Sequence, residues 1–484
     1  MKKISPIYID ILLMTIAVGL LSYTSLRAVK LSMTHDESSS YLNYINQPLS
    51  DCFSSESCWG TANLHLINTF LMQISVKVFG ENQLAVRLPN LLAHLMYLVF
   101  SFFLVRRLSD QWLWAILGFL LLNMHPYLLD FFSLARGYGL ACGFSMMSLY
   151  YLYRFLDFQK ISHILLCLLG AALAVLSNFI FLNYFAILAG FLGIWTLVWN
   201  PERGFNKWIF LGITGGTTAL LGIMLYRPII FLKAGGEFGY GVNSLWITFE
   251  QLIRDNLYGQ AYFSAPTVSI FLWMAIIFVG VSVLYGLLQA FQASNHSAHF
   301  RDFYLATSLM WVLLILSLFT QYYLLDTQFL HKRTALIFFP ISMLPVFLFL
   351  LSWLPRFKKS SQLIAAVLSI FAIYHFSRAA NMVYCREWYY DAHTEEMIDY
   401  IKSKARDHEK INLGVYWLFT HSSNFYRETQ KLDFLENIVY EREIRKDSLY
   451  DYYYVEPGHG QILHSDYELE KRFGYVAVLY RRVP

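Results

Sequence analysis

Residues 271–288 read FLWMAIIFVGVSVLYGLL and contain no charged side chain. A helix needs about 20 mainly apolar residues to cross a hydrocarbon core of roughly 30 Å. A second uncharged run, LIFFPISMLPVFLFLLSWL, occupies residues 336–354. The chain of 484 residues is 57% hydrophobic and only 14% charged, whereas soluble proteins contain about 25% charged residues. The sequence therefore predicts a polytopic α-helical membrane protein.

The position of the charges is more informative than their sum, because a net charge of +4 does not suggest a nucleic-acid partner. We expect about 11 transmembrane helices, at residues 6–28, 88–105, 111–127, 136–153, 162–177, 181–199, 207–226, 268–291, 303–323, 334–353 and 361–378. If Lys2 and Lys3 are cytoplasmic, the basic connections also fall on the cytoplasmic side, as the positive-inside rule requires. The connection that follows the first span then lies outside.

Two segments do not fit the pattern of a span. Residues 64–79 (LHLINTFLMQISVKVF) are short and carry polar side chains, so we expect an amphipathic helix on the outer surface. After Ala379 charges become frequent. There, residues 394–407 have helical spacing, and residues 411–417 and 475–482 have strand character.

These segments predict two domains, a transmembrane domain at residues 1–380 and a small extracytoplasmic soluble α/β domain at residues 381–484. Cys52 and Cys58 share the first outside loop. They could form a disulfide in an oxidising compartment, and the sequence leaves open whether they do.

The sharpest chemical signal is the acidic pair Asp36 and Glu37 in THDESSSY, residues 34–41, just after the first span. Exposed acids in a loop are ordinarily only solvated. Here, however, cationic side chains of other outside loops reach the same surface; they are Arg87, Arg136, Arg227, Lys332 and Arg333. Such cations would bind the phosphate of a membrane-anchored lipid through charge-assisted hydrogen bonds. A nearby carboxylate could accept the proton of an attacking hydroxyl group.

Four motifs then occur in an order that resembles a known family. They are HDE at residues 35–37, FGENQLAVRLPNLLAHL at 79–95, HPYLLDFFSLARGYGL at 125–140 and LHKRTALIFFP at 330–340. Over residues 1–350 the chain resembles membrane glycosyltransferases of the GT-C fold. It is similar in particular to glycosyltransferase family 39 and its relatives, which include protein O-mannosyltransferases and lipid A aminoarabinose transferases.

The resemblance implies a polyprenyl-phosphate sugar donor (undecaprenyl in bacteria), extracytoplasmic catalysis in the cell inner membrane, and inversion at the anomeric carbon. By the same resemblance, Asp36 is the general base and Glu37 its support. The residues expected to bind donor phosphate or substrate are Arg136, Arg333, Lys332, Arg87, His35, Asp130, Tyr138 and Tyr258. Many relatives have an acid or amide where this chain has Ser133 and Leu134, a role that Asp130 could take over.

Several points stay open at the level of sequence. The acceptor could be a protein, a lipid or a glycan, and membrane lipids are expected partners. No cofactor is implied with certainty, and a divalent metal ion near Asp36, Glu37 and His35 is an alternative. A transporter or flippase of a lipid-linked or small solute is a second function class, although it should bury charges near the bilayer midplane. A surface-polysaccharide polymerase or ligase and a non-catalytic scaffold are further alternatives.

Overall fold

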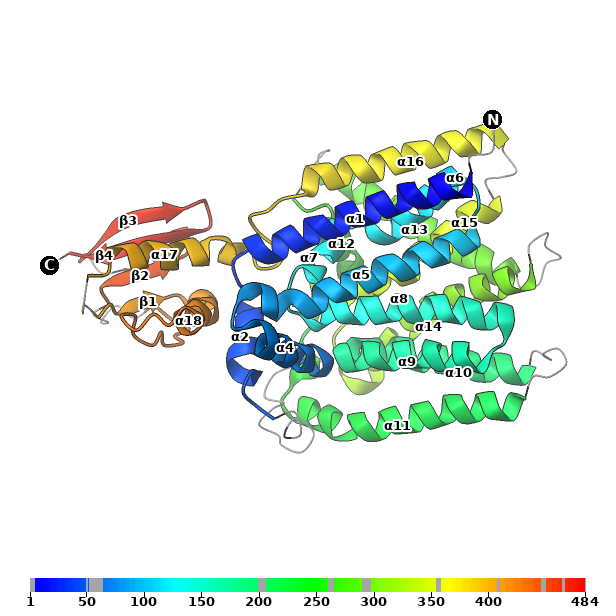
Figure 1. Ribbon diagram of the computed structural model, residues 1–484, viewed down its shortest axis with the longest axis horizontal. Coiled ribbons are helices and arrows are strands. Elements are labelled where there is room, and N and C mark those ends of the chain that lie inside the picture. Colours follow the sequence, from blue (N-terminus) through cyan, green and yellow to red (C-terminus); the bar gives the residue numbers. More distant parts are fainter. Residues whose placement is uncertain are drawn as a thin grey trace.

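The computed structural model describes residues 5–48, 51, 64–198, 206–259, 265–289, 297–353, 358–406, 410–444, 450–463 and 466–483. Long helices lie side by side in one bundle, and a small sheet with its own helices lies beyond one end of the bundle (Figure 1). Cys52 and Cys58, the candidate disulfide pair, are outside the described residues. In the described part, Cys142, Cys167 and Cys385 are buried free thiols.

The bundle is built from the helices of residues 6–379. Its long helices are α1 (Pro6–Lys30), α5 (Gln83–Leu108), α8 (Gly137–Phe158), α9 (Ile161–Ser177), α10 (Leu182–Val198), α11 (Lys207–Ala234), α13 (Ala265–Gln289), α14 (Ala298–Leu325), α15 (Phe338–Trp353) and α16 (Lys358–Ala379). Its shorter elements are α2 (His35–Tyr44), α4 (Leu66–Phe79), α6 (Trp112–Asn123), α7 (Pro126–Phe132), α12 (Leu245–Asn256) and the 3-10 helices η2 (Phe179–Phe181), η3 (Glu237–Gly239) and η4 (Lys332–Ile337).

Eight helices of the described chain are long and apolar enough to cross a membrane. The number rises to nine if α6 and α7, which are bent by 63° at a short break, form one broken span. The sequence predicted about 11 spans. The two that are missing from this number are α8 and α9, which are helices at the predicted positions. However, α9 has only 17 residues, and α8 is rich in glycine, serine and tyrosine.

The composition of α8 has a reason in helix packing. A Cβ atom added at Gly143 of α8 would lie 2.8 Å from the carbonyl oxygen of Ala93 in α5. One added at Gly170 of α9 would lie 2.9 Å from the carbonyl oxygen of Phe144 in α8. Both distances are too short for a van der Waals contact, so larger residues would push the helices apart. Small residues thus allow α8 to lie close to both neighbours.

The segment expected to be a surface helix forms α4, whose 14 residues are too few to span. The helix stops at Gly80, whose φ of +85° is a conformation that favours glycine. It lies beside α2 at the end of the bundle that faces the sheet (Figure 1). Met72 and Val76 are buried, whereas Val78 and Phe79 at its end are exposed.

The C-terminal domain contains a four-stranded sheet in the order β1-β2-β4-β3. Its elements are η6 (Tyr389–His393), α17 (Thr394–Lys404), β1 (Leu413–Val415), η7 (Trp417–Phe419), α18 (Thr420–Thr429), β2 (Tyr452–Val455), η8 (Pro457–Ile462), β3 (Tyr467–Phe473) and β4 (Ala477–Arg482). β1 and β2 are parallel, and the other two pairs are antiparallel. The prediction of a small α/β unit after the last span is therefore confirmed.

The C-terminal domain shares a hydrophobic core with the end of the bundle. Met33 and Tyr41 from the first loop belong to the same buried cluster as Phe425 and Tyr426 of α18. The Tyr426 hydroxyl accepts a hydrogen bond of 2.7 Å from the backbone N–H of Met33. The first loop and the C-terminal domain are therefore packed together, and both must lie on one side of the membrane.

This arrangement predicts a labelling pattern. In a variant with Cys52 and Cys58 replaced by serine, an impermeant thiol reagent should label Asn46→Cys and Tyr475→Cys from the same face of the membrane. It should label Asp110→Cys, in the connection between α5 and α6, only from the other face, because that connection lies at the opposite end of the bundle (Figure 1). All three positions are exposed. Labelling of Asn46→Cys and Tyr475→Cys from opposite faces would contradict the fold.

Candidate active site

The two adjacent acids lie in the first turn of α2, which a capping box holds in place. Thr34 is the N-cap, and its Oγ1 accepts a hydrogen bond from the Glu37 backbone N–H. The Glu37 carboxylate in turn accepts one of 3.1 Å from the Thr34 backbone N–H. This is the exchange expected when threonine is followed by glutamate three residues later. Because consecutive helical residues point in different directions, Asp36 and Glu37 have different surroundings.

Glu37 is completely buried and holds Arg87 of α5 in a two-point ion pair. The Arg87 Nε and Nη2 atoms lie 2.9 and 2.8 Å from the two carboxylate oxygens. The Ala135 backbone N–H and the Thr34 hydroxyl also donate to this carboxylate, at 2.6 and 3.0 Å. Burial alone would raise the pKa of Glu37, but Arg87 lowers it below the ordinary value. With its lone pairs occupied, Glu37 is not placed to accept a proton from a substrate.

Arg87 is as fully occupied as its partner. Besides Glu37, it donates to the carbonyl oxygens of Ala28, Leu31 and Ser32, at 3.1, 2.7 and 2.9 Å. Its side chain is completely buried. Arg87, which the sequence suggested as a phosphate ligand, joins α5 to the segment that leads from α1 into α2.

Asp36 lies between two arginines that come from distant parts of the chain. Its Oδ2 atom is 3.2 Å from Nη2 of Arg136, the N-cap of α8, and 3.3 Å from Nη2 of Arg333 in η4. Arg136 also donates to the Asp36 carbonyl oxygen and to the Ser40 hydroxyl, at 3.3 and 3.2 Å. Burial would raise the pKa of Asp36, but Arg136 and then Arg333 lower it below the ordinary value. The carboxylate is therefore ionised at neutral pH.

Arg333 has a second acidic partner that the sequence did not suggest. Its Nη1 pairs with Glu387, whose other oxygen accepts a 2.9 Å hydrogen bond from the Tyr127 hydroxyl. The Arg333 guanidinium also lies 5.3 Å from the ring centre of Trp388 and 5.4 Å from that of Tyr240. Glu387 and Trp388 follow the last span in CREWYY, where an acid beside aromatic residues was the only signal in the sequence.

The other predicted residues are distributed around this cluster. Tyr138 is buried, packs against His65 at a ring distance of 5.4 Å and interacts electrostatically with Arg333. Burial, followed by the two arginines, lowers the pKa of His65 well below its usual value, so this histidine is neutral. Lys332 adopts a left-handed φ of 49°, and no ion pair to it is found among the described residues.

Asp130 and Tyr258 form a separate cluster that does not include Asp36. Asp130 pairs with the buried guanidinium of Arg27, accepts hydrogen bonds of 2.9 and 3.0 Å from the Tyr258 hydroxyl, and accepts one of 2.8 Å from the Arg386 backbone N–H. Arg27 also donates to the carbonyl oxygen of Asn381, at 2.7 Å. These contacts attach the segment after α16 to the bundle. They position the neighbouring Glu387 and Trp388.

His35 faces the C-terminal domain. Its backbone N–H donates to Asp391 at 2.7 Å, and its Nδ1–H donates to the Leu418 carbonyl oxygen at 2.8 Å. Among the described residues, no group of three or more His, Cys, Asp or Glu side chains has the arrangement of a metal site. The ion-pair partners of Asp36 are the guanidinium groups of Arg136 and Arg333.

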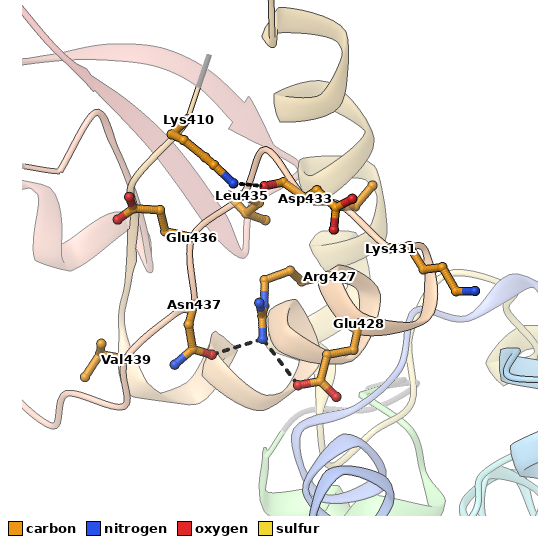
Figure 2. A pocket seen from close by; sticks show the side chains of 10 residues that line it. Lys410, Arg427, Glu428, Lys431, Asp433, Leu435, Glu436, Asn437 and Val439 are labelled. Carbon is orange, nitrogen blue, oxygen red and sulfur yellow. Dashed lines mark hydrogen bonds and ion pairs between the residues drawn. The ribbon is translucent and has the colours of Figure 1, made fainter. Parts of the chain in front are cut away.

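An open pocket of about 760 Å³ lies elsewhere, on the C-terminal domain between the end of α18 and residues 431–439 (Figure 2). Several of the charged side chains that line it form hydrogen bonds with other lining residues. Arg427 donates to Asn437 at 3.1 Å and to Glu428 at 3.3 Å, and Lys410 donates to the carbonyl oxygen of Asp433. None of the residues that the sequence singled out lines this pocket, so the pocket is not the counterpart of the Asp36 cluster.

The two acids should respond differently to neutralisation. Glu37→Gln leaves Arg87 buried without a counter-charge, which costs about 3–5 kcal/mol of stability. Asp36→Asn should cost less, because Arg333 keeps its pair with Glu387 and the ion pairs of Asp36, at 3.2 and 3.3 Å, are longer than the hydrogen bonds of 2.6–3.1 Å that Glu37 accepts. Thermal unfolding of the full chain in detergent should therefore show a much lower Tm for Glu37→Gln than for Asp36→Asn. Equal shifts in Tm would contradict this assignment of roles.

Comparison with known proteins agrees with the motifs. The family model described as dolichyl-phosphate-mannose-protein mannosyltransferase matches residues 66–226, about a third of the chain. No curated protein sequence matches. Among solved structures, ArnT from Cupriavidus metallidurans bound to undecaprenyl phosphate is similar, with 13% identity, 97% of both chains covered and a TM-score of 0.50.

Two further structures are less similar. The oligosaccharyltransferase AglB from Archaeoglobus fulgidus, in complex with an inhibitory peptide and a dolichol-phosphate, has 12% identity and a TM-score of 0.48, covering 92% of this chain and 69% of AglB. The arabinosyltransferase EmbB from Mycobacterium smegmatis has 12% identity and a TM-score of 0.43, covering 86% of this chain and 42% of EmbB. Identities this low bear on the fold and not on the substrate. The chain therefore has the GT-C fold of membrane glycosyltransferases, as its motifs predict.

Proposed function

We propose that the chain is an inverting glycosyltransferase that moves a sugar from a polyprenyl-phosphate donor to a hydroxyl group of an acceptor. The observation that carries the proposal is the Asp36 carboxylate, held between Arg136 and Arg333 at one end of a GT-C bundle. The donor class is supported by the similarity to ArnT, which was solved with undecaprenyl phosphate bound. Because one fold hosts many activities, the site itself carries the argument.

In this proposal the two adjacent acids have separate tasks. Asp36 is the general base, because its carboxylate contacts the guanidinium groups of Arg136 and Arg333, which a substrate phosphate can also bind. Glu37 is a positioning residue, because its hydrogen bonds to Thr34, Arg87 and Ala135 fix the turn that carries Asp36. A base must be held within hydrogen-bond reach of the proton that it removes. The capping box and the Arg87 ion pair provide that rigidity.

The reaction follows from these positions. The acceptor oxygen attacks the anomeric carbon as Asp36 takes the hydroxyl proton, and the new carbon–oxygen bond forms on the face opposite the phosphate. The bond between the anomeric carbon and the phosphate oxygen breaks, and its electron pair leaves with the phosphate. Arg136 and Arg333 would stabilise that oxygen through charge-assisted hydrogen bonds. The products are an inverted glycoside, a polyprenyl phosphate and a protonated Asp36.

The charges of the cluster favour this transfer of the proton. Asp36 and Glu387 carry two negative charges, which balance those of Arg136 and Arg333. A donor phosphate adds a negative charge to a buried site, where excess charge is costly. As the phosphate leaves, it gains one negative charge while Asp36 loses one by taking up a proton. The total charge of the cluster and the phosphate therefore does not change. The two arginines can therefore serve the base and the leaving group in turn.

The proposed orientation places the reaction on the extracytoplasmic face of the cell inner membrane. The end of α5 that carries Arg106 and Arg107, which are predicted to be cytoplasmic, lies at the end of the bundle opposite α2 (Figure 1). The positive-inside rule then puts α2 and the C-terminal domain outside. The thiol labelling described above, applied to intact cells, identifies which face this is.

Asp36→Asn tests the proposed base. A general base contributes roughly 10²–10⁴-fold to rate, so transfer from a panel of labelled polyprenyl-phosphate sugars should fall by about that factor in membranes. The variant should keep its folded state, for the reasons given above. Asp433→Asn, an exposed acid in the pocket of Figure 2, is the matched control and should transfer normally.

Two results would count against the proposal in different ways. Near-normal transfer by Asp36→Asn would show that another group is the base. A folded wild-type chain that transfers none of the sugars would contradict the glycosyltransferase assignment itself.

The pH dependence provides a second test. Because Arg136 and Arg333 lower the pKa of Asp36, the ionised base persists as pH falls and is lost only below its ordinary pKa. Arg333→Gln removes one cation, so the pKa rises and the acid limb of kcat/KM should move up by roughly 1–3 pH units in the residual activity. Arg254→Gln, at an exposed arginine of α12, should leave the limb in place. If the acid limb of kcat/KM does not move in Arg333→Gln, then Asp36 is not the group whose protonation this limb reports.

A further inference from the structure

Aromatic side chains of the C-terminal domain lie against His35, the residue before Asp36. The rings of His421 and Trp417 are centred 4.6 and 5.6 Å from the His35 ring. Tyr440 extends the group, with its ring centre 5.7 Å from that of His421 and 6.2 Å from that of Trp417. We call Trp417, His421 and Tyr440 the aromatic platform.

The platform is held in a fixed position relative to Asp36. The Leu418 carbonyl oxygen, between Trp417 and the start of α18, accepts the hydrogen bond from His35 Nδ1–H. Phe419 next to it is completely buried in the core that the first loop shares. The segment around His35 and the C-terminal domain are therefore joined by both a hydrogen bond and a shared hydrophobic core. The His421 ring also interacts electrostatically with Asp36, so a ligand on the platform would lie near the proposed base.

The platform also has polar edges that the protein does not use. Tyr440 is 42% exposed, and Trp417 and His421 are half-buried. Within the described residues, the Trp417 indole N–H, the His421 ring nitrogens and the Tyr440 hydroxyl form no hydrogen bond. Burial, together with His35, lowers the pKa of His421 to about 4, although Asp36 opposes this shift. His421 is thus neutral at pH 7 and offers one donor and one acceptor.

This combination matches the chemistry of a sugar ring. A pyranose has an apolar face of C–H groups that can stack on an aromatic ring, whose face is electron-rich. Its rim of hydroxyl groups needs donors and acceptors at the ring edges. A phosphate group or a charged peptide would instead need counter-charges, and the three platform side chains are uncharged.

We propose that the aromatic platform binds a sugar ring of the acceptor, so that the acceptor is a glycan whose hydroxyl group is presented to Asp36. The catalytic part of this inference rests on the proposed function. The binding part does not, because it requires only that the platform hold a carbohydrate.

Binding of free oligosaccharides without any donor is the direct test. Maltotetraose, mannotriose and chitotetraose would be titrated onto the full-length chain in detergent and followed by saturation-transfer NMR. At least one should bind, and Trp417→Ala should weaken its binding about tenfold, which is the effect of losing one stacked ring. Trp417→Phe should retain most of the affinity. Tyr475→Ala, at an exposed tyrosine away from the platform, should bind normally.

The possible outcomes separate this inference from the proposed function. Failure of all three oligosaccharides to bind, or equal binding by Trp417→Ala, overturns the platform. If Trp417→Ala loses its thermal unfolding transition, Tyr440→Ala at the exposed edge replaces it, with the same expected loss. Binding that depends on Trp417 in a chain that transfers no sugar supports the platform and contradicts the glycosyltransferase. Asp36-dependent transfer to a Ser/Thr peptide that is unaffected by Trp417→Ala supports the glycosyltransferase and overturns the platform.

Discussion

The buried ion pair between Glu37 and Arg87 is the interaction on which the candidate site depends. It joins the first turn of α2 to α5, and Arg87 also donates hydrogen bonds to the carbonyl oxygens of Ala28, Leu31 and Ser32. Exposed ion pairs contribute about 0–1 kcal/mol, but the loss of one partner of a buried pair costs several times more. The pair therefore restricts where the neighbouring Asp36 can lie. An acid on an untethered loop could not be aimed at a reacting hydroxyl group with the same accuracy.

Around Asp36, charge is balanced between groups that arrive from four parts of the chain. Arg136 caps α8, Arg333 begins the span that contains α15, and Glu387 follows the last span. In the proposed reaction, phosphate departure and proton uptake together leave the charge of the cluster unchanged, so the same two arginines would serve both events.

The C-terminal domain contributes to the site and does not merely follow it. Glu387 and Trp388 lie on the segment that leads into this domain, and Asp130 with Arg27 fixes that segment to the bundle. A division of the chain after residue 380 therefore separates residues that are in contact with one another. The shared core beneath His35 explains how a small sheet outside the membrane can hold aromatic rings beside a membrane-proximal carboxylate.

The sequence by itself determined the elements whose signals are local. Uncharged runs identify the long helices because each span must match the same hydrocarbon thickness. The segment after the first span was expected to be a loop, whereas the structure shows the helix α2, which the capping box of Thr34 and Glu37 starts. Only the tertiary structure decided that Glu37 is buried in an ion pair with Arg87 and that Asp36 contacts two arginines. It also paired Asp130 with Arg27 and brought Glu387 to Arg333. Ion pairing depends on distance in space, and the partners of Asp36 and Glu37 are too far along the chain for any local pattern to assign them.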